Sequence, residues 1–262
     1  MNSPNKKIYS AQDLKNNFAN FNFENNLQRF EKTKLGKFSN KILDLLVENF
    51  RQSYIVGGAV RDLLLGKKVF DVDMATEATP EQIIKLFVKH GVEYDAAYKN
   101  FGNVVVLCGT YKIDITTFRK DLAGPTRYPK TVYVKHASVD SKRRDFTINS
   151  LYLSLNKKNI FDPHQGLIDL KQGRLKFIGN PRKRITQDPL RIIRALRFAR
   201  SLKLKIENKT YQAIKNNFSL LKNISISRSE KELNKISDPT NKKIVRSILT
   251  GQKNLDKYFK TQ

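Results

Sequence analysis

The feature that most constrains this chain is a pair of glycines after a short apolar segment, followed by two closely spaced aspartates. Residues 54–56 form an apolar strand that runs into Gly57-Gly58, and a second strand is expected to end in Asp71-x-Asp73. Glycines let backbone N–H groups approach a phosphate closely, and the start of the helix expected after them adds the positive end of its dipole. Side chains at positions i and i+2 of a strand share one face, so the two aspartates should converge beside this phosphate cradle.

Two carboxylates beside a phosphate cradle can bind a pair of Mg²⁺ ions, which lie about 3.5–4 Å apart in two-metal phosphoryl chemistry. Alone, a glycine pair is more often a simple turn, and Asp-x-Asp is commonly a solvated strand end. Here the two occur together, with Arg61-Asp62 between them. We therefore predict that Asp71 and Asp73 are catalytic metal ligands and that Gly57, Gly58 and Arg61 bind a nucleotide.

The charge of the chain predicts a polyanionic partner. Its formal net charge is +26, from 50 Lys and Arg against 24 Asp and Glu. Such an excess repels itself in a compact fold, and a nucleic acid would neutralise it. A lysine-rich proteome is the alternative explanation, but the arginines cluster at 143–144, 182–184 and 191–200.

Several classes of protein are disfavoured by composition. No run of about 18 apolar residues predicts a membrane span, and the first residues lack the apolar core of a secretory signal. The lone Cys108 excludes an intramolecular disulfide and any cysteine-based zinc cluster. The expectation is a soluble, cytoplasmic protein.

The chain divides by pattern into three parts. Residues 1–35 read as a basic N-terminal arm, with a helix possible within 11–31. Residues 36–180 alternate helical and strand patterns, including a capped helix start at residues 79–82 and a hairpin over residues 104–118, and predict a mixed α/β domain. Residues 181–262 have helical periodicity throughout, with a boundary at 180–187.

Asp114 has two possible roles. It interrupts an otherwise apolar-alternating strand over residues 111–118. It could be a third catalytic carboxylate facing the metal ions, or an outward, solvated residue. The sequence leaves both open.

A second motif, Arg143-Arg144-Asp145 with Asn149, carries further polar groups. Adjacent arginines offer planar donor forks for phosphate oxygens. Asp145 and Asn149 would share one face if the segment were helical and could then meet a ribose hydroxyl together. The alternative is a helix-capping aspartate and a surface asparagine. We predict that Arg144, Asp145 and Asn149 bind a nucleotide.

A third motif begins at Asp188-Pro189, a natural helix start. Arg191, Arg194 and Arg197 recur every three residues beside an apolar stripe, which predicts one cationic ridge facing the α/β domain. Asp188 and Arg191 together supply acceptors and donors that could contact the Watson–Crick edge of an incoming base. We predict nucleotide binding by Asp188 and all three arginines.

The three motifs stand in a fixed order: Gly57-Gly58-Ala59-Val60-Arg61-Asp62 with Asp71-x-Asp73, then Arg143-Arg144-Asp145-Phe146-Thr147-Ile148-Asn149, then Asp188-Pro189-Leu190-Arg191 with Arg194-Ala195-x-Arg197-Phe198. In these motifs and their spacing, the chain resembles the class II tRNA nucleotidyltransferase and bacterial poly(A) polymerase family, within the DNA polymerase β superfamily. The resemblance covers residues 40–235. The resemblance implies a nucleotidyltransferase head with a mixed five-stranded sheet, followed by a helical neck, body and tail.

The resemblance also implies the chemistry. Asp71 and Asp73 would bind catalytic Mg²⁺, the Arg-Arg-Asp segment would hold ribose and triphosphate, and Asp188 with Arg191 would select CTP or ATP without a nucleic-acid template. The partners implied are ATP, CTP and RNA, with the 3′ end of tRNA favoured.

Two departures from the family pattern affect substrate choice. Gln187 replaces the usual acidic residue before Asp188, and because the chain ends at residue 262, the resemblance implies that most of the body and tail that hold tRNA would be missing. The positive charge and residues 1–35 could compensate. The oligomeric state is not indicated.

Three functions remain open. Residues 102–106 resemble the flexible-loop region of tRNA-adding enzymes and favour CCA addition or part of it. Residues 63–68 and the N-terminal extension resemble the polyadenylating branch. A catalytically weak RNA-binding protein with a transferase-like head is a third reading.

Overall fold

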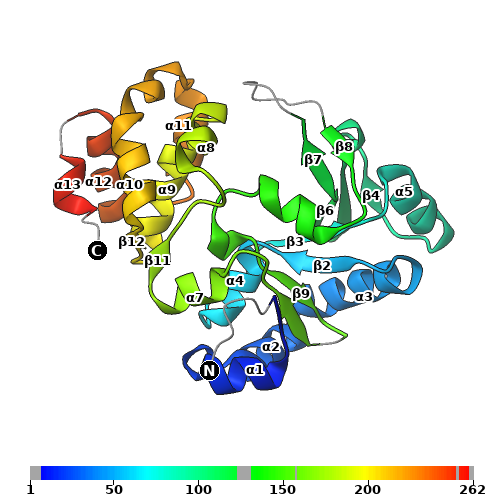
Figure 1. The fold of residues 1–262 in the computed structure, drawn as a ribbon. Helices are drawn as coiled ribbons and strands as arrows, with labels where there is room; N and C mark the ends of the chain where they lie inside the picture. Colours follow the sequence, from blue (N-terminus) through cyan, green and yellow to red (C-terminus); the bar gives the residue numbers. More distant parts are fainter. Residues whose placement is uncertain (1–6, 123–130, 157, 252–253, 260–262) are drawn as a thin grey trace. The chain divides into compact units, whose positions relative to one another are not determined.

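The computed structural model describes residues 7–122, 131–156, 158–251 and 254–259 (Figure 1). The chain forms two compact units. Unit 1 comprises Met1–Leu122, Thr131–Arg144 and Asn149–Gly166, and unit 2 comprises Ala123–Lys130, Asp145–Ile148 and Leu167–Gln262. Residues 1–6 of the predicted arm, and residues 252–253 and 260–262 of the predicted body, lie outside the described part. The predicted domain boundary at 180–187 stays a prediction.

Unit 1 is built on a mixed sheet with the strand order β1-β10-β9-β2-β3-β6-β5-β4. Its strands are β1 (Ile8–Tyr9), β2 (Ser53–Val56), β3 (Val72–Thr76), β4 (Tyr94–Asp95), β5 (Asn103–Cys108), β6 (Tyr111–Thr117), β9 (Tyr152–Ser154) and β10 (Asn159–Phe161). Strands β3 and β6 run parallel, and the other neighbours are antiparallel. The mixed sheet is as expected, but it has eight described strands rather than five. The edge strands are too short to show alternation in sequence.

The remaining elements of unit 1 are mostly helical. The helices are α1 (Ala11–Asn17), α2 (Phe23–Lys32), α3 (Lys34–Asn49), α4 (Gly58–Leu64), α5 (Pro80–Lys89) and α6 (Ala137–Asp140), and β7 (Arg119–Asp121) pairs with β8 (Thr131–Tyr133). Short 3₁₀ turns occur at Ala19–Phe21, Lys99–Phe101, Ser141–Arg143 and Thr147–Asn149, the last crossing into unit 2. The expected start of α5 is confirmed, because Thr79 and Gln82 form a reciprocal capping box.

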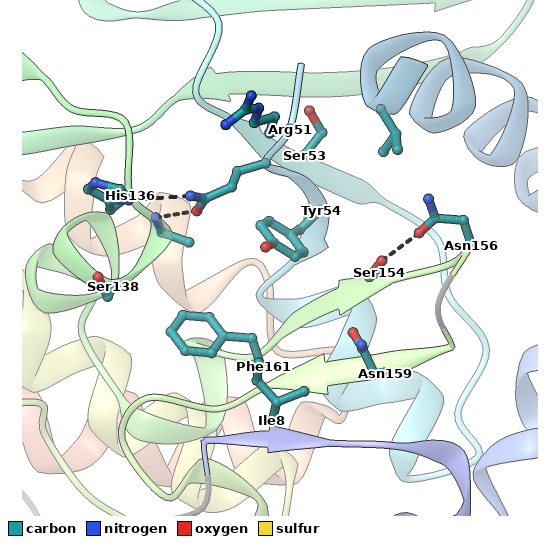
Figure 2. A pocket seen from close by; sticks show the side chains of 13 residues that line it. Ile8, Arg51, Ser53, Tyr54, His136, Ser138, Ser154, Asn156, Asn159 and Phe161 are labelled. Carbon is teal, nitrogen blue, oxygen red and sulfur yellow. Dashed lines mark hydrogen bonds between the residues drawn. The ribbon is translucent and has the colours of Figure 1, made fainter. Parts of the chain in front are cut away.

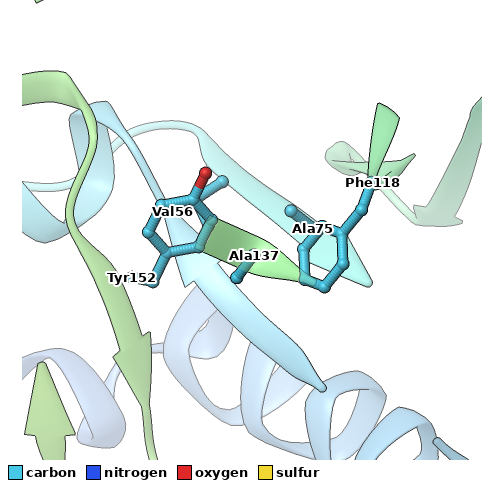
Figure 3. Close-up of a cluster of buried hydrophobic side chains, with 5 residues drawn as sticks. All are labelled: Val56, Ala75, Phe118, Ala137 and Tyr152. Atoms are coloured by element: carbon cyan, nitrogen blue, oxygen red, sulfur yellow. The ribbon is translucent and has the colours of Figure 1, made fainter. Parts of the chain in front are cut away.

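One face of the unit 1 sheet carries a buried hydrophobic cluster of Val56, Ala75, Phe118, Ala137 and Tyr152 (Figure 3). The register pairs Val56 with Tyr152 on one side and with Asp73 on the other. Residues paired across neighbouring strands share a face, so this cluster packs on the same face that carries Asp73. The cluster fixes the strands on which the acidic residues stand.

Unit 2 is mainly helical. Its helices are α7 (Gly166–Lys171, which starts at the last residue of unit 1), α8 (Pro181–Gln187), α9 (Leu190–Ser201), α10 (Asn208–Asn216), α11 (Ile226–Leu233), α12 (Pro239–Leu249) and α13 (Leu255–Tyr258), with a 3₁₀ segment at Phe218–Asn223. Strands β11 (Arg174–Leu175) and β12 (Lys205–Ile206) pair in parallel. The part after residue 180 was expected to be all helical, and β12 is the exception, because two residues cannot show strand periodicity.

The core of unit 2 includes stacked phenylalanines. The rings of Phe146 and Phe177 lie 4.7 Å apart, and Phe198 from α9 meets Phe146 edge to face at 5.6 Å. Helix α8 begins at the expected break, where Asn180 caps the helix and Pro181 is its first residue. Within the described ranges, no helix is long and apolar enough to cross a membrane.

Candidate active site

Asp71 and Asp73 stand at the beginning of β3. The expectation that this strand ends at the aspartates is wrong, because β3 spans Val72–Thr76 and its apolar residues follow the acidic ones. Exposed and buried residues alternate from Asp71 to Met74. The two carboxylates therefore leave the sheet on one face, as the i, i+2 spacing predicted.

Asp114 lies beside Asp73. Strand β6 pairs with β3 so that these two residues are direct partners. Asn103 on β5 donates a hydrogen bond from Nδ2 to Asp114 Oδ1 at 3.1 Å. The structure thus places Asp114 on the carboxylate face. In the described part of the chain, no group of three or more His, Cys, Asp or Glu side chains is close enough to form a metal site.

Gly57 forms the turn between β2 and α4 and lies close to both charged groups of the site. Its φ of +73° falls in the region that favours glycine. A Cβ atom built on Gly57 would lie 3.9 Å from Asp73 Oδ2 and 3.7 Å from Arg144 Nη1. A carboxylate of β3 and a guanidinium from the second motif therefore meet at the glycine turn.

Arg61 is buried beneath this turn. Its Nη1 donates a hydrogen bond to Asn149 Oδ1 at 2.6 Å, and its Nε and Nη2 bond Asp62 Oδ1 at 2.9 and 2.8 Å. Gly58, at the start of α4, has Arg61 Nη2 3.5 Å from its Cβ position. Arg61 thus fixes the position of Asn149.

Arg144 is held by a buried acidic partner. Its Nε donates to Tyr152 Oη at 2.9 Å, and Nε and Nη2 each lie 3.3 Å from Asp140 Oδ2. Arg143 Nε bonds the other oxygen of Asp140 at 2.7 Å, and the side chain of Asp140 is 0% exposed. Two arginines and a tyrosine thus surround one carboxylate.

The pKa values reflect this network. Burial by itself lowers the pKa of Arg144, but Tyr152, Asp140 and Asp73 raise it above its ordinary value. Burial by itself raises the pKa of Asp140, but Arg143 and Arg144 lower it below its usual range. Both groups stay ionised at neutral pH, so Arg144 presents a fixed positive charge beside Gly57.

Asp145 and Asn149 do not share a helix face. Joint contact of the two side chains with a ribose hydroxyl was expected only if this segment were helical. Asp145 precedes a 3₁₀ turn at Thr147–Asn149, and Phe146 between them forms a bridge to Phe177. That bridge fixes the backbone in a non-helical conformation. Asn149 bonds Arg61 within unit 1, whereas Asp145 bonds Arg194 within unit 2.

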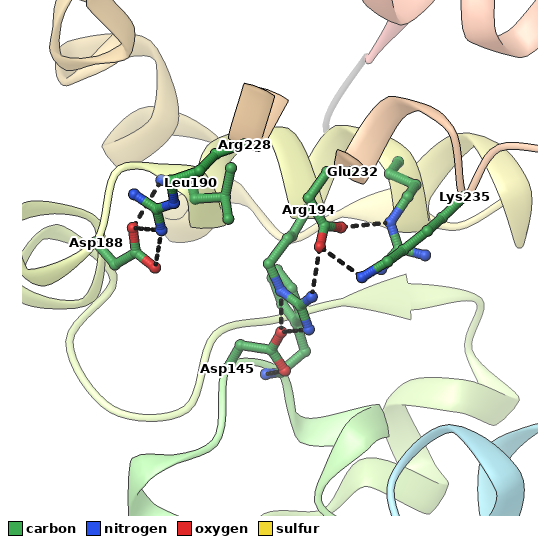
Figure 4. Close-up of polar contacts among 9 residues, drawn as sticks. Asp145, Asp188, Leu190, Arg194, Arg228, Glu232 and Lys235 are labelled. Carbon is green, nitrogen blue, oxygen red and sulfur yellow. Dashed lines mark hydrogen bonds and ion pairs between the residues drawn. The ribbon is translucent and has the colours of Figure 1, made fainter. Parts of the chain in front are cut away.

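In unit 2, two arginines of α9, Arg194 and Arg197, are paired with acids (Figure 4). Arg194 lies 2.6 Å from Asp145 Oδ2 and 3.2 Å from Glu232 Oε1, and Arg197 Nε lies 3.0 Å from Glu232 Oε2. The expectation of a continuous cationic ridge is therefore wrong. Burial by itself lowers the pKa of Arg194, but Asp145 and Glu232 raise it above its ordinary value.

Asp188 has a partner that the sequence did not reveal. Arg228 Nη2 lies 3.0 and 3.2 Å from its two carboxylate oxygens (Figure 4). Asp188 Oδ1 also accepts from the backbone N–H of Leu190 at 3.2 Å, which supports the start of α9. Arg191 Nη1 donates to the carbonyl of Arg184 at 2.7 Å and to Gln187 Oε1 at 3.2 Å.

A pocket of about 380 Å³ opens beside Asp188. Gln187 and Arg228 line it as well. Gln187, which stands where an acidic residue was expected, is thus part of the polar wall of this pocket, and its side chain accepts a hydrogen bond from Arg191. The pocket contains both donors and acceptors, as recognition of a base edge requires.

Sequence reasoning missed the residues that hold these groups in place. Asp140 had a detectable signal, because an acid three residues before Arg143 can pair with it on a helical turn. Tyr152, Arg228 and Glu232 had none, because each lies in an element remote from its partner. Only the fold brings them together.

Comparison with known proteins gives a consistent set of matches. Residues 53–176 match the family described as the poly A polymerase head domain, and residues 203–236 match one described as a probable RNA and SrmB-binding site of polymerase A. A CCA-adding enzyme of Lactobacillus helveticus is 42% identical over 198 residues, which cover 74% of this chain and 48% of that enzyme. The chain spans about half the length of the curated relatives it matches.

Solved structures with a similar fold include enzymes of the same kind as these sequence relatives. The crystal structure of the Bacillus stearothermophilus CCA-adding enzyme in complex with CTP aligns with a TM-score of 0.69 and 33% identity, over 78% of this chain and 49% of that one. A tRNA nucleotidyltransferase complexed with a primer tRNA and an incoming ATP analog aligns with a TM-score of 0.63 and 31% identity, over 79% and 59% of the two chains.

Proposed function

This chain belongs, through residues 53–176, to the family of the poly A polymerase head domain, and we propose on that basis that it is a template-independent RNA nucleotidyltransferase. It adds nucleotides from CTP and ATP to the 3′ end of tRNA, as CCA addition or part of it. The observation that carries the proposal is the meeting of Asp73, Arg144 and the Gly57 turn in unit 1. Similarity to enzymes solved with CTP and with a primer tRNA supports the substrates.

The carboxylate face fits divalent cations, and Mg²⁺ is the ion proposed. Asp71 and Asp73 are exposed oxygen donors on one face, with Asp114 beside Asp73. Mg²⁺ is commonly bound through one or two carboxylates together with substrate phosphates. When bound, such ions activate the attacking hydroxyl and stabilise the leaving pyrophosphate.

The protein's own groups position the nucleotide. Arg144 is fixed by Asp140 and Tyr152, so its charge can meet the triphosphate without losing side-chain entropy. Asn149, held by Arg61, is the group proposed for the ribose. Asp145, Arg194 and Arg197 form, with Glu232, a partly buried network that supports α9 rather than a surface for phosphate.

Base selection is proposed for Asp188 and Arg191 on unit 2. Arg228 orients the carboxylate of Asp188, and Gln187 orients the guanidinium of Arg191. Binding of the base would require Arg191 to exchange a bond to Gln187 or Arg184 for one to the nucleotide.

Poly(A) addition is the second candidate, favoured by the description of the head-domain family. A binder without turnover is the third. The cytoplasm is the proposed location, because the exposed thiol of Cys108 suits a reducing compartment.

A primer-extension gel separates these functions. The purified chain is incubated with Mg²⁺ and a tRNA lacking CCA, with CTP and ATP supplied singly and together. A stop after three additions supports CCA addition, a stop after one or two supports part of it, and a long ladder with ATP alone supports poly(A) addition. If no RNA is lengthened at any enzyme concentration, the transferase proposal is wrong and the binder is favoured.

A further inference from the structure

Unit 1 contains a pocket of about 500 Å³ whose lining includes neither Asp71 nor Asp73 (Figure 2). Its lining comes from the end of α3, the residues that lead into and begin β2, the start of α6, strands β9 and β10, and Ile8 of β1. Tyr54 and Val56 are two residues apart on β2, so the pocket opens on the sheet face that also carries Asp73. The hydrophobic cluster of Figure 3 separates the pocket from Asp73, since the Tyr54 ring contacts the rings of Tyr152 and Phe118.

The floor of this pocket is aromatic. Tyr54 and Phe161 are half-buried and line it, and Ile8, 56% exposed, adds an apolar edge. Packing against Tyr152 fixes both rings, at 5.8 Å each. Rigid, partly exposed rings are the surfaces on which nucleobases stack.

Polar groups surround this floor without protein partners. In the described part of the chain, the guanidinium of Arg51, the hydroxyl of Tyr54 and the carboxamide of Asn159 make no hydrogen bond. Figure 2 shows Arg51 and Asn159 at opposite ends of the pocket, with Tyr54 between them. A rigid pocket with several unpartnered polar groups is typical of a ligand site.

One wall is held in place by internal bonds. Gln52 Nε2 lies 3.3 Å from His136 Nδ1, and Gln52 Oε1 accepts from the N–H of Ala137 at 3.1 Å. The second ring nitrogen of His136 has no hydrogen-bond partner among the described residues. Among the described lining residues, Arg51 alone carries a full charge at neutral pH. The carboxylate of Glu77 accepts a hydrogen bond from the backbone N–H of Arg51 at 2.8 Å.

We propose that this pocket binds a nucleotide, with the base over Tyr54 and Phe161, the base edge at Asn159, and the phosphate at Arg51 and His136. A cation, an aromatic floor and a carboxamide together match the three parts of a nucleotide. The volume lies within the range of about 300–1,000 Å³ found for small-ligand sites. None of the residues that line this pocket belongs to the proposed catalytic site, so nucleotide binding here is independent of the proposed function. The nucleotide can be a unit of a single-stranded RNA or a free mononucleotide.

The test uses the full chain carrying Asp73→Ala, without divalent metal, so that no turnover occurs. Two probes are used: a fluorescein-labelled eight-nucleotide single-stranded RNA, by anisotropy, and free AMP or CMP, by calorimetry. Arg51→Ala and Asn159→Ala are compared with Lys89→Ala, which removes an exposed cation of α5 outside the pocket. Circular dichroism checks that each variant is folded.

Arg51→Ala should weaken binding about tenfold and Asn159→Ala about threefold, as expected for a charged and a neutral hydrogen bond. Lys89→Ala should change binding less than twofold at about 0.15 M salt, where exposed charges are screened. A loss for RNA alone assigns the pocket to a strand, and a loss for AMP or CMP as well assigns it to a free nucleotide. If both pocket variants bind both probes as the parent does, or lose no more than Lys89→Ala, the proposal is overturned. Because no turnover is measured, that result leaves the primer-extension gel unaffected.

Discussion

Two arginine networks, one in each unit, have different consequences. In unit 1, Asp140 holds Arg143 and Arg144, yet Arg144 Nη1 still lies near Gly57 and the exposed carboxylate face. In unit 2, Glu232 binds Arg194, Arg197 and Lys235. The first network holds the positive charge of Arg144 beside the glycine turn. In the second network, the positive charges of α9 are neutralised by an acid of α11, so they stabilise the packing of helices.

The difference shows that charge counted in a sequence is not charge available to a ligand. Arg194 and Arg197 have the regular spacing of a phosphate-binding ridge, but both guanidinium groups pair with the buried carboxylate of Glu232. Arg144 lies in a pair of adjacent arginines without helical periodicity, and it is the one that reaches the glycine turn. Variants in the two units can test this contrast.

The largest effect is expected at the carboxylate face. Asp73→Ala should lower nucleotide incorporation by about 10³-fold or more, because loss of a metal ligand costs several kcal/mol of transition-state stabilisation. Labelled-nucleotide incorporation into tRNA measures it. Asp44→Ala, an exposed aspartate of α3, is the matched control and should keep parent activity. Near-normal incorporation by Asp73→Ala would place the chemistry elsewhere.

The second effect is on stability in unit 1. Asp140→Asn should lower the free energy of unfolding by about 3–5 kcal/mol, because two partly buried arginines lose their buried counter-charge. Urea denaturation measures the loss. A change below 1 kcal/mol would show that this network is not the support we infer.

The same variant gives a pH test with a defined sign. Burial by itself raises the pKa of Asp140, but Arg143 and Arg144 lower it, so the folded state binds this proton less readily than the unfolded state. The stabilisation is therefore present above about pH 4 and is lost as the pH falls further. Asp140→Asn should show a shallower decline in stability below pH 4 than the parent.

A smaller loss is expected for the equivalent change in unit 2. Glu232→Gln should cost about 1–3 kcal/mol, because Arg194 keeps Asp145 as a partner and the amide still accepts one hydrogen bond. Urea denaturation of parent and variant gives the comparison. If Glu232→Gln costs more than Asp140→Asn, the ranking of the two networks is reversed.

The smallest effect is expected at the pocket beside Asp188. Arg228→Ala removes the side chain that orients Asp188 and should shift the preference between CTP and ATP by about five- to tenfold, equivalent to about 1–1.4 kcal/mol. Competition between the two labelled nucleotides measures the shift. Arg246→Ala, which breaks an exposed ion pair with Glu230, should leave the preference unchanged. An equal shift in both variants would contradict the role of Arg228.

Features encoded within a few residues were predicted well. The capping box of α5 and the hairpin of β5 and β6 are both confirmed, and each depends on residues close in sequence. The exact limits of the strands were not predicted correctly, since Asp71 and Asp73 lie at the beginning of β3 and not at its end. Apolar alternation marks the presence of a strand more reliably than its ends.

The sequence by itself determined the chemical groups and their local geometry: a glycine turn, two carboxylates at i and i+2, and arginines in fixed order. Steric limits on the backbone and strand alternation operate over a few residues, so spacing reveals them. Only the tertiary structure decided that Asp114 stands beside Asp73, and that Glu232, 38 residues from Arg194, neutralises it. Strand register and ion pairing join segments that packing alone brings together, and no local pattern records which partners will meet.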